Sequence, residues 1–105
     1  MTVGTNGSFT LLILSDNTLV TNSPDVVIGA NATAKSNEVQ LISSSARWAH
    51  GGLLFVGSNG ALSRLVVSNG ATVREGAAYL GFNASGSNNQ AWVTGSSSVR
   101  DAGVL

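Results

Sequence analysis

The chain has 105 residues, five basic and five acidic side chains, a formal net charge of zero and no cysteine. A surface that follows phosphates needs clustered Lys and Arg, so we expect no nucleic-acid partner. Without cysteine the chain forms no disulfide and no cysteine-bound zinc site. A hydrophobic content of 43% with so few charges is also the opposite of a disordered composition.

No segment has the length of a membrane span. The longest apolar run, at residues 11–14, is far too short to cross a bilayer, so we expect no membrane insertion by this segment. The N-terminal residues lack a basic stretch followed by an apolar core, and we expect no signal peptide there.

The predicted elements are short strands. No stretch keeps apolar residues at helical spacing, and Gly, Asn and Ser separate short β-branched runs. In chain order, longer segments of period-two alternation lie at 11–20, 38–47, 64–73 and 90–99, and short strands precede the glycines at 26–28, 54–56 and 78–80.

One motif, an aliphatic residue followed by Gly, any residue and Asn, occurs four times. It reads VGTN at 3–6, IGAN at 28–31, VGSN at 56–59 and LGFN at 80–83. Self-similarity at a fixed period is the signature of repeat architectures. We therefore take the motif as the marker of one repeated unit.

The four longer segments align with one another. One column of the alignment holds Leu12, Val39, Leu65 and Ala91, at steps of 27, 26 and 26, and another holds Leu14, Leu41, Val67 and Val93. A third joins Val20, Val73 and Val99, where the second unit presents Arg47 and is expected to slip so that Trp48 enters.

Units of about 26 residues with two or three short strands predict an all-β chain in one domain, a parallel β-helix (solenoid). Stacked turns lie about 4.8 Å apart, so equivalent residues form continuous internal columns. We expect about four turns, at residues 3–27, 28–55, 56–79 and 80–105. The motif glycines would form the corners, and the motif asparagines would form a hydrogen-bonded ladder of Asn6, Asn31, Asn59 and Asn83.

An antiparallel sandwich is the competing prediction. Asn69-Gly70 is a strong two-residue hairpin signal. The equivalent positions of the other units, however, are much poorer hairpin turns, and a sandwich does not explain the constant step. The β-helix is favoured.

The units SRLVVSNGATVREGAAYLGFN and NNQAWVTGSSSVRDAGVL resemble the repeats of bacterial autotransporter-type passenger domains. The resemblance covers essentially the whole chain and is repetitive rather than motif-specific. It implies a right-handed parallel β-helix, carried outside the cell or on its surface after export across an outer membrane. We also expect an uncapped fragment of a longer solenoid, whose open strand ends favour self-association.

Catalysis has little support in the sequence. The alignment places no two acids in one column of neighbouring turns, as a polysaccharide-cleaving pair would require. His50 is a lone loop histidine, and no spacing suggests a metal site or a cofactor. We expect no enzyme, no metal and no cofactor.

Two sets of outward residues are candidates for ligand binding. Trp92 faces away from the core in a column with Val66, Gln40 and Ile13, and Tyr79 and Phe55 form another outward column. Arg74 and Arg100 occupy equivalent positions one unit apart, each followed by an acid. They form either a solvated patch of ion pairs or a clamp for an acidic sugar.

The sequence therefore supports a structural or adhesive segment of a surface-displayed passenger, whose partners would be host-surface or glycan ligands. The alternative is a carbohydrate-binding or polysaccharide-active module near Trp92. A phage fibre or tailspike segment is the weaker alternative, since it requires trimerisation.

Overall fold

The computed structural model describes residues 1–21, 25–49, 51–95 and 98–101, and for residues 98–101 it describes the backbone alone. The described residues contain twelve strands and no helix. The strands are β1 (Thr2–Val3), β2 (Leu11–Leu14), β3 (Leu19–Thr21), β4 (Val26–Ile28), β5 (Glu38–Leu41), β6 (Arg47–Ala49), β7 (Leu53–Val56), β8 (Arg64–Val67), β9 (Thr72–Glu75), β10 (Ala77–Leu80), β11 (Gln90–Val93) and β12 (Ser98–Asp101).

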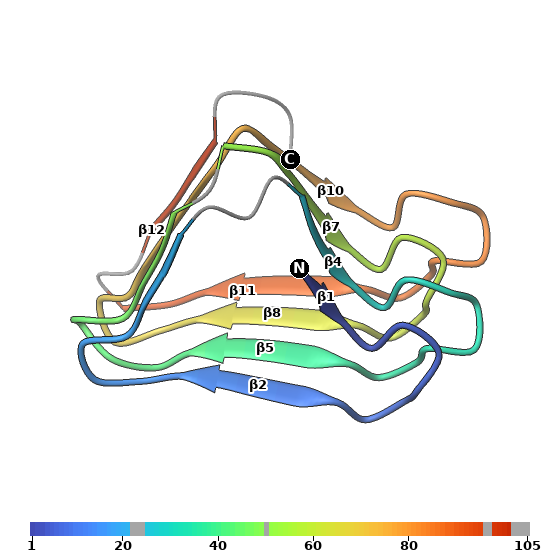
Figure 1. Cartoon of the computed structure of the whole chain (residues 1–105), viewed down its shortest axis with the longest axis horizontal. Coiled ribbons are helices and arrows are strands. Elements are labelled where there is room, and N and C mark those ends of the chain that lie inside the picture. Colours follow the sequence, from blue (N-terminus) through green and yellow to red (C-terminus); the bar gives the residue numbers. More distant parts are fainter. Residues whose placement is uncertain (22–24, 50, 96–97, 102–105) are drawn as a thin grey trace.

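These strands form three parallel sheets. Sheet A has the order β1-β4-β7-β10, sheet B the order β2-β5-β8-β11 and sheet C the order β3-β6-β9-β12. In Figure 1 the three sheets form the sides of a triangle, and the chain visits them in turn. Three complete circuits run from β1 to β10, and β11 and β12 begin the next one. The prediction of an all-β parallel solenoid is confirmed, with about three complete turns rather than about four.

The internal columns follow the predicted register. In sheet B, Leu12 pairs with Val39, Val39 with Leu65, and Leu65 with Ala91. The column that contains Leu41 is continuous in the same way. Leu14, Leu41 and Val67 are each at most 1% exposed, so this column fills the centre of the solenoid. Burial of these aliphatic side chains is the main favourable term in folding.

Trp48 enters the third column, as expected. It pairs with Val20 below and Val73 above, and it is 1% exposed. The connection at residues 42–46 makes this possible, since it is one residue longer than those at 15–18 and 68–71. The extra residue moves Arg47 to an outward position and places the indole in the core.

The inward columns become exposed at the last turn. Leu80 and Val93 hold inward positions in β10 and β11, yet they are 43% and 45% exposed. β10 pairs only with β7 and β11 only with β8, so in the described chain the other side of each of these two strands carries no further strand.

The corner between sheets A and B explains the motif glycines. Gly4, Gly29, Gly57 and Gly81 have φ between 75° and 78°, a left-handed conformation that favours glycine. A second constraint comes from the following turn. A Cβ on Gly4 would collide with the side chain of Asn37, and one on Gly57 with that of Asn89.

Those asparagines belong to an internal polar column that the sequence reasoning missed. Asn37 Oδ1 accepts a hydrogen bond from Thr10 N at 2.9 Å, and Asn89 Oδ1 accepts one from Ser63 N at 2.7 Å. Each amide therefore satisfies a backbone donor at the start of the strand one turn below. The signal was available, because Thr10, Asn37, Ser63 and Asn89 directly precede the aligned strands of sheet B.

The Asn69-Gly70 turn lies at the corner between sheets B and C. Both residues have positive φ, as a hairpin turn would require, but β8 and β9 belong to different sheets and do not pair. The turn bends the chain around the triangle, so the antiparallel alternative is wrong. The side chain of Asn69 donates to the carbonyl oxygen of Ile42 on the turn below.

We predict that Gly57→Ala lowers the free energy of unfolding by about 2 kcal/mol or more, because it combines a left-handed backbone with a collision against Asn89. Gly7→Ala is the matched control, since a Cβ there meets nothing within 4 Å. Chemical denaturation measures both losses. In the double variant with Asn89→Ala the collision disappears, so the combined loss should be smaller than the sum of the single losses. Equal losses in Gly57→Ala and Gly7→Ala would contradict this corner geometry.

Candidate functional site

The outer face of sheet B carries the predicted Trp92 column. Ile13, Gln40, Val66 and Trp92 pair in register along the four strands. The Trp92 side chain is 51% exposed, which leaves ring surface accessible to a ligand. An aromatic ring on a rigid strand contributes contact area at little cost in conformational entropy.

A chain of polar contacts leads to Trp92 across three turns. Gln40 Nε2 donates to Glu38 Oε1 at 2.6 Å, and Arg64 Nη2 lies 3.0 Å from Glu38 Oε1 and 3.1 Å from Oε2. The Arg64 guanidinium carbon also lies over the Trp92 ring, 5.8 Å from its centroid. Because Arg64 is 39% exposed and Glu38 20%, the ion pair contributes only about 0–1 kcal/mol. Its effect is to fix the orientation of the guanidinium beside the ring.

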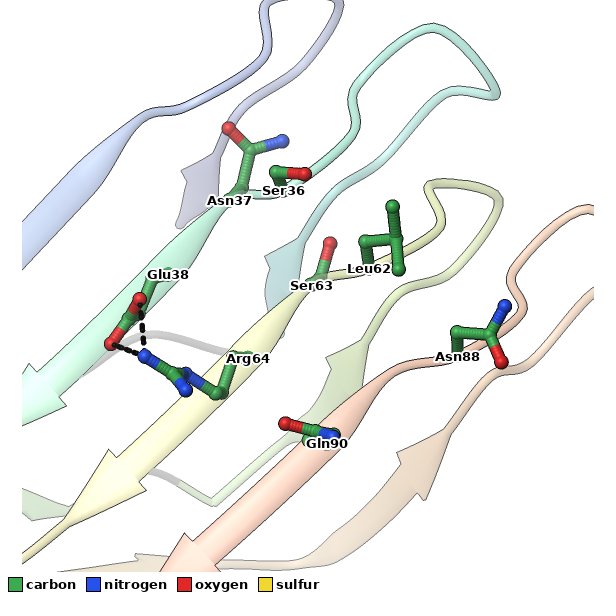
Figure 2. Close-up of a pocket in the computed structure, with 8 residues that line it drawn as sticks. All are labelled: Ser36, Asn37, Glu38, Leu62, Ser63, Arg64, Asn88 and Gln90. Atoms are coloured by element: carbon green, nitrogen blue, oxygen red, sulfur yellow. Dashed lines mark hydrogen bonds and ion pairs between the residues drawn. The ribbon is translucent and has the colours of Figure 1, made fainter.

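A hollow of about 210 Å³ opens beside this ion pair, where the strands of sheet B begin. Figure 2 shows Glu38 joined to Arg64, with Gln90 on the adjacent strand. Carboxylate, guanidinium, amide and hydroxyl groups are suited to hydrogen bonding with sugar hydroxyls. The hollow is smaller than an ordinary ligand pocket, so it holds part of a ligand at most. It is lined by Ser36, Asn37, Glu38, Leu62, Ser63, Arg64, Asn88 and Gln90.

The outer face of sheet A carries a cluster of three aromatic rings. Phe55 and Tyr79 pair in register as predicted, and their rings stack with centroids 5.3 Å apart and planes 15° apart. Phe82 contacts both rings edge-on, at 5.0 Å and 5.3 Å. The sequence reasoning missed Phe82, although it is the variable residue of the LGFN motif. The three rings cover part of one another, and Tyr79 and Phe82 remain 36% and 53% exposed.

The outer face of sheet C contains the arginine candidates. Arg74 is exposed, and its backbone pairs with Arg100 in register. The side chain of Arg100 lies outside the described part of the structure. A hollow of about 550 Å³ lies beside Arg74 and also contacts Arg47.

Two expectations about acids are wrong. Glu75 does not form an exposed pair with Arg74, because Glu75 is only 3% exposed and faces the interior. Acids also share a column in neighbouring turns, since Asp101 pairs with Glu75 in register. The alternation of strand residues places Arg74 and Glu75 on opposite faces of β9.

In the predicted asparagine ladder, one pair of neighbouring side chains is joined by a hydrogen bond. Asn31 Nδ2 donates to Asn6 Oδ1 at 2.6 Å, whereas Asn59 Nδ2 donates to the carbonyl oxygen of Ala30 at 3.0 Å. The backbone N–H of Asn83 donates to the carbonyl oxygen of Ser58. The connections at this corner alternate in length, because 29–37 and 81–89 are two residues longer than 4–10 and 57–63. A short connection stacked on a long one draws Asn59 away from Asn31.

Among the described residues, no group of three His, Cys, Asp or Glu side chains could hold a metal ion. The same residues include no helix with the length and apolar character needed to cross a membrane. His50, taken above as a loop residue, lies outside the described residues.

Comparison with protein-family models, with curated proteins and with solved structures finds no match to this chain.

Proposed function

We propose that this chain is a structural and adhesive segment of a secreted or surface-displayed β-solenoid, of the autotransporter passenger type, without catalysis of its own. The observation that carries the proposal is the unbroken register of three parallel sheets around one aliphatic core. Such a stack lengthens along its axis by about 4.8 Å per turn while its cross-section stays constant, which suits a stalk that holds a surface away from a cell.

The surface of the solenoid supports the adhesive part of the proposal. Two of its exposed aromatic residues lie on the outer faces of sheets A and B, where Tyr79 is 36% and Trp92 51% exposed. Adjacent turns hold these rings at fixed positions, so a ligand meets a rigid surface. The exposed inward columns at Leu80 and Val93 offer a further apolar surface, on which another turn or a second copy would stack.

Carbohydrate binding at Trp92 is the second candidate, and one arrangement favours it. Trp92 and Gln90 both lie on β11. The oriented guanidinium of Arg64 comes from the adjacent strand β8. A sugar ring stacked on Trp92 would find hydrogen-bonding groups within the neighbouring turn.

The structural role predicts that two directly fused copies form one longer solenoid. Each copy should add about four strand spacings, roughly 19 Å, to the length with no change in cross-section. Small-angle X-ray scattering measures both dimensions. A fusion through a long Gly/Ser linker is the control, and it should scatter as two independent bodies. A direct fusion that scatters like this control would argue against a stalk.

A glycan array identifies the glycans that bind the parent protein. Carbohydrate binding predicts that Trp92→Ala weakens binding to these glycans by about tenfold or more, because a central aromatic anchor is removed. Ile13→Ala is the matched control, since Ile13 is 48% exposed in the same outward column on a distant turn. Both variants should have a free energy of unfolding close to that of the parent, since both side chains are about half exposed. Equal binding by the parent and Trp92→Ala would remove this candidate.

A further inference from the structure

Two exposed cations lie on the outer face of sheet C. Arg47 in β6 and Arg74 in β9 are both exposed, and neither has an acidic partner among the side chains that the structure describes. The described outward neighbours on this face are uncharged: Leu19, Thr21, Ala49 and Thr72. The acid of β9, Glu75, is buried on the opposite face.

The register places these arginines on successive turns. Arg47 pairs with Thr72, and Arg74 follows two residues later in the same strand. The two positions are thus one strand spacing apart across the sheet and about 7 Å apart along the strand. The backbone position beside Arg74 on the next turn is again an arginine, Arg100. Like charges on adjacent strands are destabilising, so arginines that repeat with no acidic partner among the described side chains point to an anion supplied from outside.

A hollow of about 550 Å³ connects the two arginines, and this volume lies within the range of ordinary ligand sites. Ser44 and Thr72 supply hydroxyl groups to its lining, and Leu19 supplies an apolar side chain. Guanidinium groups bind carboxylates through two parallel hydrogen bonds, and they remain charged at all physiological pH values. Hydroxyls can hydrogen-bond with the hydroxyl groups around the edge of a sugar ring, and an apolar side chain can pack against its C–H face.

We propose that this hollow binds a polyuronate, a linear polysaccharide that carries carboxylates. Arg47 and Arg74, on successive turns, each bind one carboxylate. A polymer fits better than a single anion, because the cations repeat along the solenoid axis. A nucleic acid fits less well, because one cation per turn on a chain of zero net charge is not a clustered basic surface. The inference rests on the adhesive part of the proposed function and gives it a ligand class, on a different face from Trp92.

The test measures binding of polygalacturonate fragments of increasing length to the full chain by isothermal titration calorimetry. Methyl-esterified polygalacturonate is the matched probe, since it keeps the sugar backbone and removes the charge. We expect the affinity to rise with fragment length and to fall between about 50 and 200 mM salt, and the ester to bind at least about tenfold more weakly. An ester that binds as tightly as the acid would overturn the proposal.

Variants locate the site. Arg47→Gln and Arg74→Gln should each weaken polygalacturonate binding by about tenfold, because each removes a charge-assisted contact. Lys35→Gln, which removes an exposed cation from the connection between β4 and β5, should change it by less than about twofold. Circular dichroism shows whether each variant is folded. An equal loss in Lys35→Gln, or none in Arg74→Gln, contradicts the assignment.

Other polyanions test the ligand class. Heparin, single-stranded DNA or vesicles with anionic lipids that bind as tightly as polygalacturonate would overturn the assignment to a polyuronate. If polygalacturonate does not bind while Trp92-dependent glycan binding persists, this inference fails and the proposed function stands. If neither binds, the adhesive part of the proposed function fails as well.

Discussion

The hydrogen-bonded register between successive turns is the constraint on which the rest of this molecule depends. Each turn lies one strand spacing above the previous one, so every position in the repeat must accept its own equivalent as a neighbour. Inward positions meet this requirement with aliphatic side chains, and the column through Leu41 shows how completely they are buried. A single large residue, Trp48, is accommodated where the preceding connection gains one residue. Packing and connection length are thus adjusted together.

The same stacking explains why each outer face has its own chemistry. Sheet A presents stacked rings at Phe55 and Tyr79, sheet B the Arg64 guanidinium beside Trp92, and sheet C the arginines of β6 and β9. Equivalent residues align with the solenoid axis, so each face presents its groups along a line. A linear polymer can follow such a line over several turns and gain affinity from each contact. This geometry connects the rigid core to the adhesive role that we propose for the surface.

The sequence was most informative where packing is repeated. Apolar columns at steps of 26 and 27 residues revealed the strands, the side of each strand that faces the core, and the position of Trp48. They did so because a core residue must align with its neighbours in every turn. It was least informative at the corners, where the chain has other means of satisfying its polar groups. Asn59 bonds to a backbone carbonyl, and Asn37 and Asn89 enter the interior as partners of backbone N–H groups. Glu75 lies in the interior because alternation along the strand places it opposite Arg74, and charge alone had suggested an exposed residue.

Engineered disulfides test the stacked register most directly, since the chain has no cysteine of its own. Gln40 and Val66 pair across β5 and β8, at a spacing within the range of a disulfide. In a hairpin around Asn69-Gly70, Val66 would instead face Val73. Mild oxidation followed by mass spectrometry of peptides should show a disulfide in Gln40→Cys/Val66→Cys and none in Val66→Cys/Val73→Cys. The reverse result would contradict the solenoid.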